Sequence, residues 1–131
     1  MKHIVSVILV LISFSHSANA EIKKVVFHID QKEKGSYLVR SVGNFVSSNP
    51  NAKVVVVVNN TAVLRLYVKS KLSTKFTELM QQGVDVGVCN NAIIANEVDA
   101  ASVIPGVKFL KKGGVTRIIE LQSQGYAYIK I

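Results

Sequence analysis

The sequence has little of several residue types, and each shortage excludes a class of protein. Its 131 residues include one cysteine and no tryptophan. One cysteine cannot form an intramolecular disulfide framework or a cysteine-based structural zinc site. Charged residues make up 18% of the chain against 49% hydrophobic residues, which excludes a disordered protein. The length excludes a large multidomain enzyme, since about 100–200 residues form one domain.

Acidic residues are also scarce, because eight Asp and Glu accompany sixteen Lys and Arg and leave a net charge of +8. Such an excess favours anionic partners. The lysines are scattered, however, and no basic run alternates with aromatic residues as in nucleic-acid-binding modules, so we expect no nucleic-acid partner. The chain has no His–carboxylate metal cluster and no G-x-G-x-x-G motif, and we expect neither a metal nor a cofactor.

The longest apolar run lies at the N-terminus. A basic start at Lys2 and His3 precedes the apolar residues Ile4–Phe14, and the small residues Ala18-Asn19-Ala20 follow. This order is typical of a secretory signal peptide, and the run is too short for a bilayer, which takes about 20 residues. We therefore expect a signal peptide over residues 1–20, cleavage after Ala20, a periplasmic or secreted location without membrane attachment, and one domain over residues 21–131.

Five short runs rich in β-branched or aromatic residues predict strands, and segments with helical spacing separate them. The strands are expected at Lys23–Asp30, Val54–Val58, Val84–Val88, Val107–Leu110 and Tyr126–Lys130. Helices are expected over Ser36–Ser48, from Leu72 to Met80, from Asn90 to Ala95, and after Gly113-Gly114. Five consecutive valines indicate a strand that is covered on both faces. The order predicts a three-layer α/β/α domain with a mostly parallel sheet.

Cys89 is the strongest candidate for chemistry, because functional residues of such sheets lie where strands end and helices begin. Unpaired N–H groups at a helix start favour the thiolate, which accepts sulfur, exchanges disulfides and binds soft metals. Asn90 and Asn91 would cap the helix and shape its start. The alternative is a buried structural thiol, since free cysteines are among the most buried residues.

Two further features are weaker candidates. Lys111-Lys112-Gly113-Gly114 stands where the fourth strand meets its helix, and a glycine-bearing helix start can bind an anion. The alternative is a glycine turn with solvated lysines. His28 lies near the carboxyl end of the first strand. It could pair with Cys89 if the first and third strands are neighbours, but an intervening strand would place the two side chains about 10 Å apart. We interpret His28 as a partly buried histidine with a backbone partner rather than as a base for Cys89.

At the third strand the sequence resembles a known family. Residues 83–92 read GVDVGVCNNA and resemble the G-V-x-V-x-V-C-x-N-A stretch of DsrE/DsrF-like proteins, a small family of sulfur relay and sulfur oxidation. Pro105-Gly106-Val107 and residues 125–130 resemble the family's later segments. The resemblance implies a five-stranded parallel sheet in the order 4-3-2-1-5 and homo-oligomers, either trimers or hexamers. It also implies that Cys89 accepts sulfur as a persulfide.

Two departures from the family matter. Asn59-Asn60 stands where relatives often carry a glycine, and the best-understood members are cytoplasmic, whereas this chain is expected to be exported. The leading hypothesis is an exported sulfur carrier that exchanges sulfur with a donor or acceptor protein or with a small anionic sulfur species. The alternative is a non-catalytic oligomeric module that binds a small ligand or a protein. A thiol enzyme is less favoured, because the chain has no C-x-x-C motif and no convincing base.

Overall fold

The computed structural model describes residues 20–131, so the expected signal peptide lies outside the described residues except for Ala20. The strands are β1 (Lys24–Ile29), β2 (Lys53–Val58), β3 (Asp85–Cys89), β4 (Lys108–Leu110) and β5 (Ala127–Lys130). The α-helices are α1 (Gly35–Ser48), α2 (Ser73–Gln81), α3 (Asn90–Ala95) and α4 (Gly114–Ser123). Short 3₁₀ helices are η1 (Lys32–Lys34), η2 (Asn60–Arg65) and η3 (Ala100–Ser102). All five predicted strands and all four predicted helices are present.

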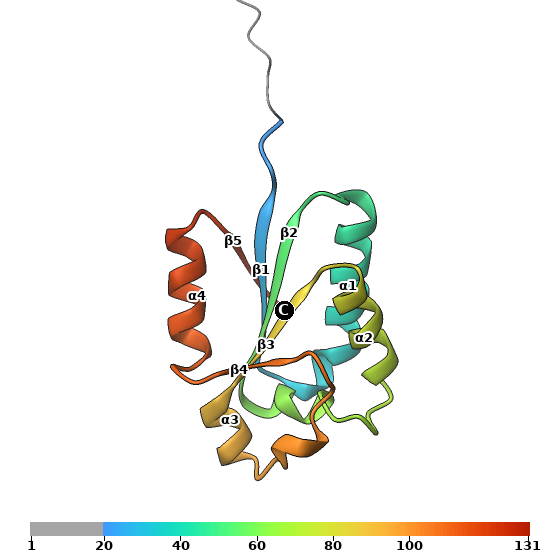
Figure 1. Ribbon diagram of the computed structural model, residues 1–131, viewed down its shortest axis with the longest axis vertical. Helices are drawn as coiled ribbons and strands as arrows, with labels where there is room; N and C mark the ends of the chain where they lie inside the picture. Colours follow the sequence, from blue (N-terminus) through green and yellow to red (C-terminus); the bar gives the residue numbers. More distant parts are fainter. Residues whose placement is uncertain (1–19) are drawn as a thin grey trace, which may run out of the picture.

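The five strands form one sheet in the order β4-β3-β2-β1-β5, and every neighbouring pair is parallel. This is the order that the family resemblance implied. The carboxyl ends of the strands all lie at one end of the domain, and residue 20 enters at the opposite end (Figure 1). Strand β2 lies between β1 and β3, so it separates the strand that carries His28 from the strand that carries Cys89.

Helices cover both faces of the sheet, which confirms the three-layer prediction. In Figure 1, α1 and α2 lie on one side of the sheet, α4 lies on the other, and α3 lies at the carboxyl end of the strands. Alternate residues of the strands face the two layers, because side chains in a strand point to opposite faces in turn. Val56 packs with Leu38 and Phe76, whereas Val57 packs with Ile118 and Leu121.

The valine run forms the middle of the core. Residues 54–58 are each between 0% and 5% exposed, as expected for a strand covered on both faces. The layer of α1 and α2 covers a large apolar cluster, whereas the cluster under α4 contains only five buried residues among those described. A single helix, α4, therefore covers this face of the sheet.

The start of α3 differs from the prediction. Cys89 itself is the residue that caps this helix, with an extended backbone at φ −62° and ψ 119°, and Asn90 and Asn91 are its first two helical residues. Strand β3 continues into α3 without an intervening loop, so no position remains for an asparagine cap. Similarly, α4 begins at Gly114, because Gly113 has φ +91° and ψ 161°, a conformation outside the helical region.

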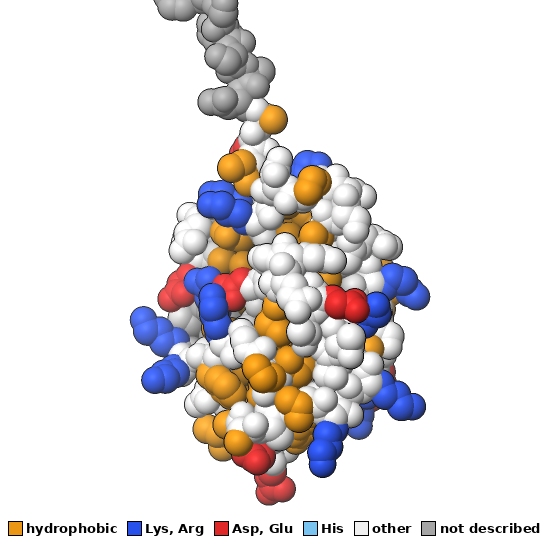
Figure 2. Space-filling view, turned by 45° about the vertical axis from the view of Figure 1, so that its right-hand side comes forward, with side chains coloured by type: hydrophobic (Ala, Val, Ile, Leu, Met, Phe, Trp, Pro, Cys, Tyr) orange, Lys and Arg blue, Asp and Glu red, His pale blue; other side chains and the backbone are white. Residues whose placement is uncertain are grey.

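The surface carries hydrophobic side chains between basic ones. Figure 2 shows a band of hydrophobic side chains down the middle of one face, with Lys and Arg along both sides. The most exposed large hydrophobic residues are Ile94 in α3 and Val115 and Ile119 in α4, at 68%, 64% and 61% exposed. No helix in the described part of the chain is both long and apolar enough to cross a bilayer.

Candidate functional site

Cys89 lies in the wall of a pocket at the carboxyl end of the sheet. Its side chain is partly exposed, which argues against the interpretation of a fully buried structural thiol. The pocket has a volume of about 250 Å³ and lies between the ends of β2 and β3 and the start of α4. The residues that line it are Asn59, Cys89, Asn91, Lys112, Gly113, Gly114, Val115 and Thr116. We refer to it below as the Cys89 pocket.

The structure brings together five of the seven candidates from the sequence. Cys89, Asn91, Lys112, Gly113 and Gly114 all line the Cys89 pocket. Asn90 is adjacent in α3 but does not line it. Lys111 lines a separate cleft of about 410 Å³, which lies over β3 and β4 beside α4 and which shares Lys112 and Gly113 with the Cys89 pocket.

Sequence reasoning missed three lining residues, Asn59, Val115 and Thr116, of which Asn59 also contacts His28. An asparagine directly after a strand suits a turn or a helix cap, but the Asn59 side chain makes no capping hydrogen bond to η2. It lies one residue after the buried valine strand, and Val58 pairs with Val88 across the sheet. Asn59 and Cys89 therefore follow at matching positions on neighbouring strands. The rule that sites lie at strand ends could have identified Asn59.

The start of α4 offers main-chain donors to the pocket. Arg117 is the first residue of this helix whose N–H group forms the helical hydrogen bond. It donates to the carbonyl oxygen of Gly113, the residue before the helix, at 3.3 Å. No side chain caps the helix, so the N–H groups of Gly114, Val115 and Thr116 lack partners within it. Such donors, with the positive end of the helix dipole, favour an anionic group.

The lysines next to these donors are free to contribute positive charge. Lys108 pairs with Asp85 at 3.0 Å, and Arg117 lies 4.0 Å from the same carboxylate and 3.7 Å from Glu120. Lys111 and Lys112 are exposed and form no ion pair with any residue in the range 20–131. The pocket entrance therefore retains net positive charge from Lys112.

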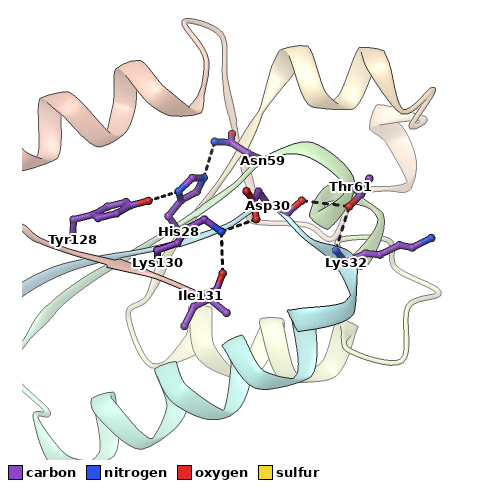
Figure 3. A network of polar contacts seen from close by, with 8 residues as sticks. All are labelled: His28, Asp30, Lys32, Asn59, Thr61, Tyr128, Lys130 and Ile131. Atoms are coloured by element: carbon purple, nitrogen blue, oxygen red, sulfur yellow. Dashed lines mark hydrogen bonds and ion pairs between the residues drawn. The ribbon is translucent and has the colours of Figure 1, made fainter.

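His28 belongs to a polar network beside the pocket, and its predicted backbone partner is wrong. Its Nδ1 lies 2.7 Å from the Tyr128 hydroxyl, and its Nε2 lies 3.0 Å from Nδ2 of Asn59 (Figure 3). Burial lowers the pKa of His28, the nearby Lys130 ammonium lowers it further, and Asp30 partly opposes both effects. Because β2 lies between β1 and β3, His28 does not reach Cys89 directly but contacts Asn59, which lines the same pocket.

The described residues do not gather the ligands of a metal site. No group of three or more His, Cys, Asp or Glu side chains lies close enough within residues 20–131 to hold a metal ion. The Cys89 pocket combines a thiol with the start of α4, two carboxamides and a lysine.

Solved structures of other proteins have the same fold. MTH1491 from Methanobacterium thermoautotrophicum, a protein of unknown function, is 31% identical over 83% of this chain and 99% of its own, with a TM-score of 0.77. YchN from E. coli is 14% identical over 84% of this chain and 100% of its own, with a TM-score of 0.74. BT1422 from Bacteroides thetaiotaomicron, also of unknown function, is 14% identical with a TM-score of 0.58 and covers 82% of this chain and 95% of its own.

The family is shown by a match to most of the chain. No curated protein matches this chain. The model of the DsrE/DsrF-like family matches residues 7–131. This agrees with the fold, the strand order and the resemblance of the segment around Cys89. The chain therefore belongs to the DsrE/DsrF-like family.

Proposed function

We propose that this protein carries sulfur on Cys89 as a persulfide. The observation that carries the proposal is the partly exposed thiol in a pocket that also contains the unpaired N–H groups at the start of α4. Membership of the DsrE/DsrF-like family supports a role in sulfur chemistry. An anionic persulfide beside Cys89 would lie next to hydrogen-bond donors and Lys112, which favour negative charge.

The transfer step needs no external oxidant or reductant. The Cys89 thiolate attacks a sulfane sulfur of a polysulfide or of a persulfide on a donor protein. A new S–S bond forms on Cys89, the S–S bond of the donor breaks, and its electron pair leaves with the shortened donor thiolate. Passing the sulfur to an acceptor thiolate repeats these steps in reverse. For an exported protein, as we propose, donor and acceptor belong to the compartment outside the cytoplasm.

Intact mass spectrometry after incubation with sodium polysulfide tests the proposal. Wild-type protein is expected to gain the mass of one or more sulfur atoms, and a reductant should remove them. Cys89→Ser should gain none, since it differs from wild type by one atom and lacks the only thiol. Equal gains in both proteins, or no gain in either, would contradict the proposal. An inert thiol would instead support the alternative of a non-catalytic binding module.

We also propose that several copies of the chain assemble, as trimers or hexamers. Val115 and Ile119, which are four residues apart and so lie on the same side of α4, support this because they are 64% and 61% exposed and would be covered by a neighbouring copy. Val115 also lines the Cys89 pocket, so a neighbouring copy placed there would lie close to the thiol. Sedimentation velocity on the domain without its first 20 residues should give a species of at least three chains. A monomer at micromolar concentration would contradict the proposal.

A further inference from the structure

The two hydrogen-bond partners of His28, in the orientation that the Asn59 carboxamide has here, fit a neutral ring. The amide nitrogen of Asn59 can only donate, so the Nε2 atom that it faces at 3.0 Å must be the unprotonated acceptor. The ring proton is then on Nδ1, which donates to the Tyr128 oxygen at 2.7 Å. The orientation of the Asn59 carboxamide is therefore coupled to the protonation of His28 (Figure 3).

The other end of the Asn59 carboxamide is buried against the start of α4. Its Oδ1 has no hydrogen-bond partner among the described residues and is closed off from solvent. The group lies directly against Gly114, where a Cβ atom would come within 2.7 Å of the Asn59 Cγ. The carboxamide is thus held between His28 on one side and the first residue of α4 on the other, in the wall of the Cys89 pocket.

Protonation of His28 is incompatible with this orientation of the carboxamide. The imidazolium donates from both nitrogens, so Nε2–H would face the Asn59 NH₂ group, donor against donor. A half-turn of the carboxamide places Oδ1 opposite Nε2–H and gives this buried oxygen the partner that it lacks. The NH₂ group then takes the place of Oδ1 beside Gly114 and the pocket.

We propose that Asn59 is a positioning residue that transmits the protonation state of His28 to the Cys89 pocket. With neutral His28 the carboxamide places its carbonyl oxygen against Gly114 in the pocket wall, and with the imidazolium it places its NH₂ group there. An NH₂ group and a nearby positive charge both favour an anionic sulfur on Cys89. The inference rests on the proposed function and adds a pH-dependent control of Cys89 at the same site.

The charged neighbours of His28 leave it as the group that titrates near neutral pH. Asp30, the residue after β1, and Lys130 on β5 form an ion pair at 2.6 Å. The hydrogen bond from Lys130 lowers the pKa of Asp30, so this carboxylate stays ionised across the range in which histidine titrates. Tyr128 is the other neighbour of the ring on β5, and the neighbour that follows β2 is the uncharged Asn59. The first turn of α4 carries no charge, since it consists of Gly114, Val115 and Thr116.

The pH dependence of Cys89 reactivity tests the proposal. The probe is 2,2′-dipyridyl disulfide, which reacts with thiols in acid as well as at neutral pH, and the rate is measured from about pH 4.5 to about pH 8. Wild type should show an inflection at the His28 midpoint, which lies below 6.5, with a rate on the acid side about threefold above that of His28→Gln. His28→Gln keeps an amide on this site but cannot titrate, so the inflection should disappear.

Two further variants separate transmission through Asn59 from a direct effect of charge. In Asn59→Ala, NMR should show that His28 still titrates, but the inflection in Cys89 reactivity should be lost. In Tyr128→Phe the partner of Nδ1 is lost while the bond to Asn59 remains, so the inflection should persist. An inflection that survives in Asn59→Ala, or is absent from wild type, would overturn the proposal. Circular dichroism of each variant confirms its fold.

The failure of this inference is distinguishable from the failure of the proposed function. Sulfur loading is measured separately, by mass, above the His28 midpoint. If Cys89 takes up no sulfur but its reaction rate still depends on the protonation of His28 through Asn59, the carrier function is wrong and the coupling between His28 and Cys89 is correct. If Cys89 takes up sulfur without any inflection in its reactivity, the carrier function stands and the link is overturned.

Discussion

Replacing Phe76 by alanine is expected to lower the free energy of unfolding by about 3–5 kcal/mol. Phe76 is 1% exposed and lies in α2, where it packs into the large apolar cluster between the sheet and the layer of α1 and α2. The loss combines the transfer free energy of the ring with the cavity that it leaves. Since small domains have about 5–15 kcal/mol in total, this variant would be close to unfolding at room temperature.

Phe45→Ala is the matched control for this variant. It removes the same side chain from the same face of the sheet, but Phe45 is only partly buried and makes an edge contact with Phe27 at 5.9 Å between ring centroids. Its truncation should cost about 1–2 kcal/mol, since less apolar area returns to water. Urea unfolding followed by circular dichroism measures both. An equal cost for the two variants would contradict the assignment of Phe76 to the centre of the core.

Local pattern was sufficient to predict the elements that form this core. Residues 54–58 could only be a strand covered on both faces, because five adjacent β-branched residues suit neither an exposed strand nor a helix with one apolar side. The apolar offsets around Leu38 and Phe76 similarly predicted the buried faces of α1 and α2, and both side chains are buried. These signals are readable because each depends on residues that are neighbours in the sequence.

The role of Asn59 could not be read in this way. An asparagine after a strand suits a turn or a cap, and both interpretations use only nearby residues. The observed partner, His28, is 31 residues away, and the contact exists because β1 and β2 are adjacent in the sheet. The strand order excludes a direct contact between His28 and Cys89. Asn59 lies between His28 and Cys89. To predict this, the direction of the Asn59 side chain must be known as well as the order of the strands.

The two glycines before α4 illustrate the same limit. The sequence pattern at Gly113-Gly114 predicts a helix start that can bind an anion, and the alternative is a simple glycine turn. Gly113 has φ +91° and ψ 161°, a conformation that is essentially confined to glycine. Gly114 is needed for a different reason, the close approach of Asn59. Both residues thus have structural roles, and these do not conflict with the unpaired N–H groups that they place in the Cys89 pocket.

Gly114→Ala is therefore expected to separate Asn59 from His28 and to lower the free energy of unfolding by about 2–3 kcal/mol. The new Cβ would lie 2.7 Å from the Asn59 Cγ and 2.8 Å from its Nδ2, so the carboxamide has to leave its position. The cost combines this overpacking with the loss of the partly buried hydrogen bond to His28. The higher helix propensity of alanine offsets at most about 1 kcal/mol.

A double-mutant cycle distinguishes this specific overlap from general damage to the loop. In Asn59→Ala/Gly114→Ala the carboxamide is absent, so the added methyl group has space, and the double variant should be more stable than the sum of the single losses predicts by about 1–2 kcal/mol. Gly113→Ala is the control, because its cost comes from backbone strain at φ +91° and should simply add to that of Asn59→Ala. NMR titration of His28 provides a second readout: Gly114→Ala should move its midpoint, whereas Gly113→Ala should leave it in place. Strict additivity in the cycle with Gly114 would show that Asn59 does not pack against the start of α4, and it would remove the structural basis for coupling His28 to Cys89.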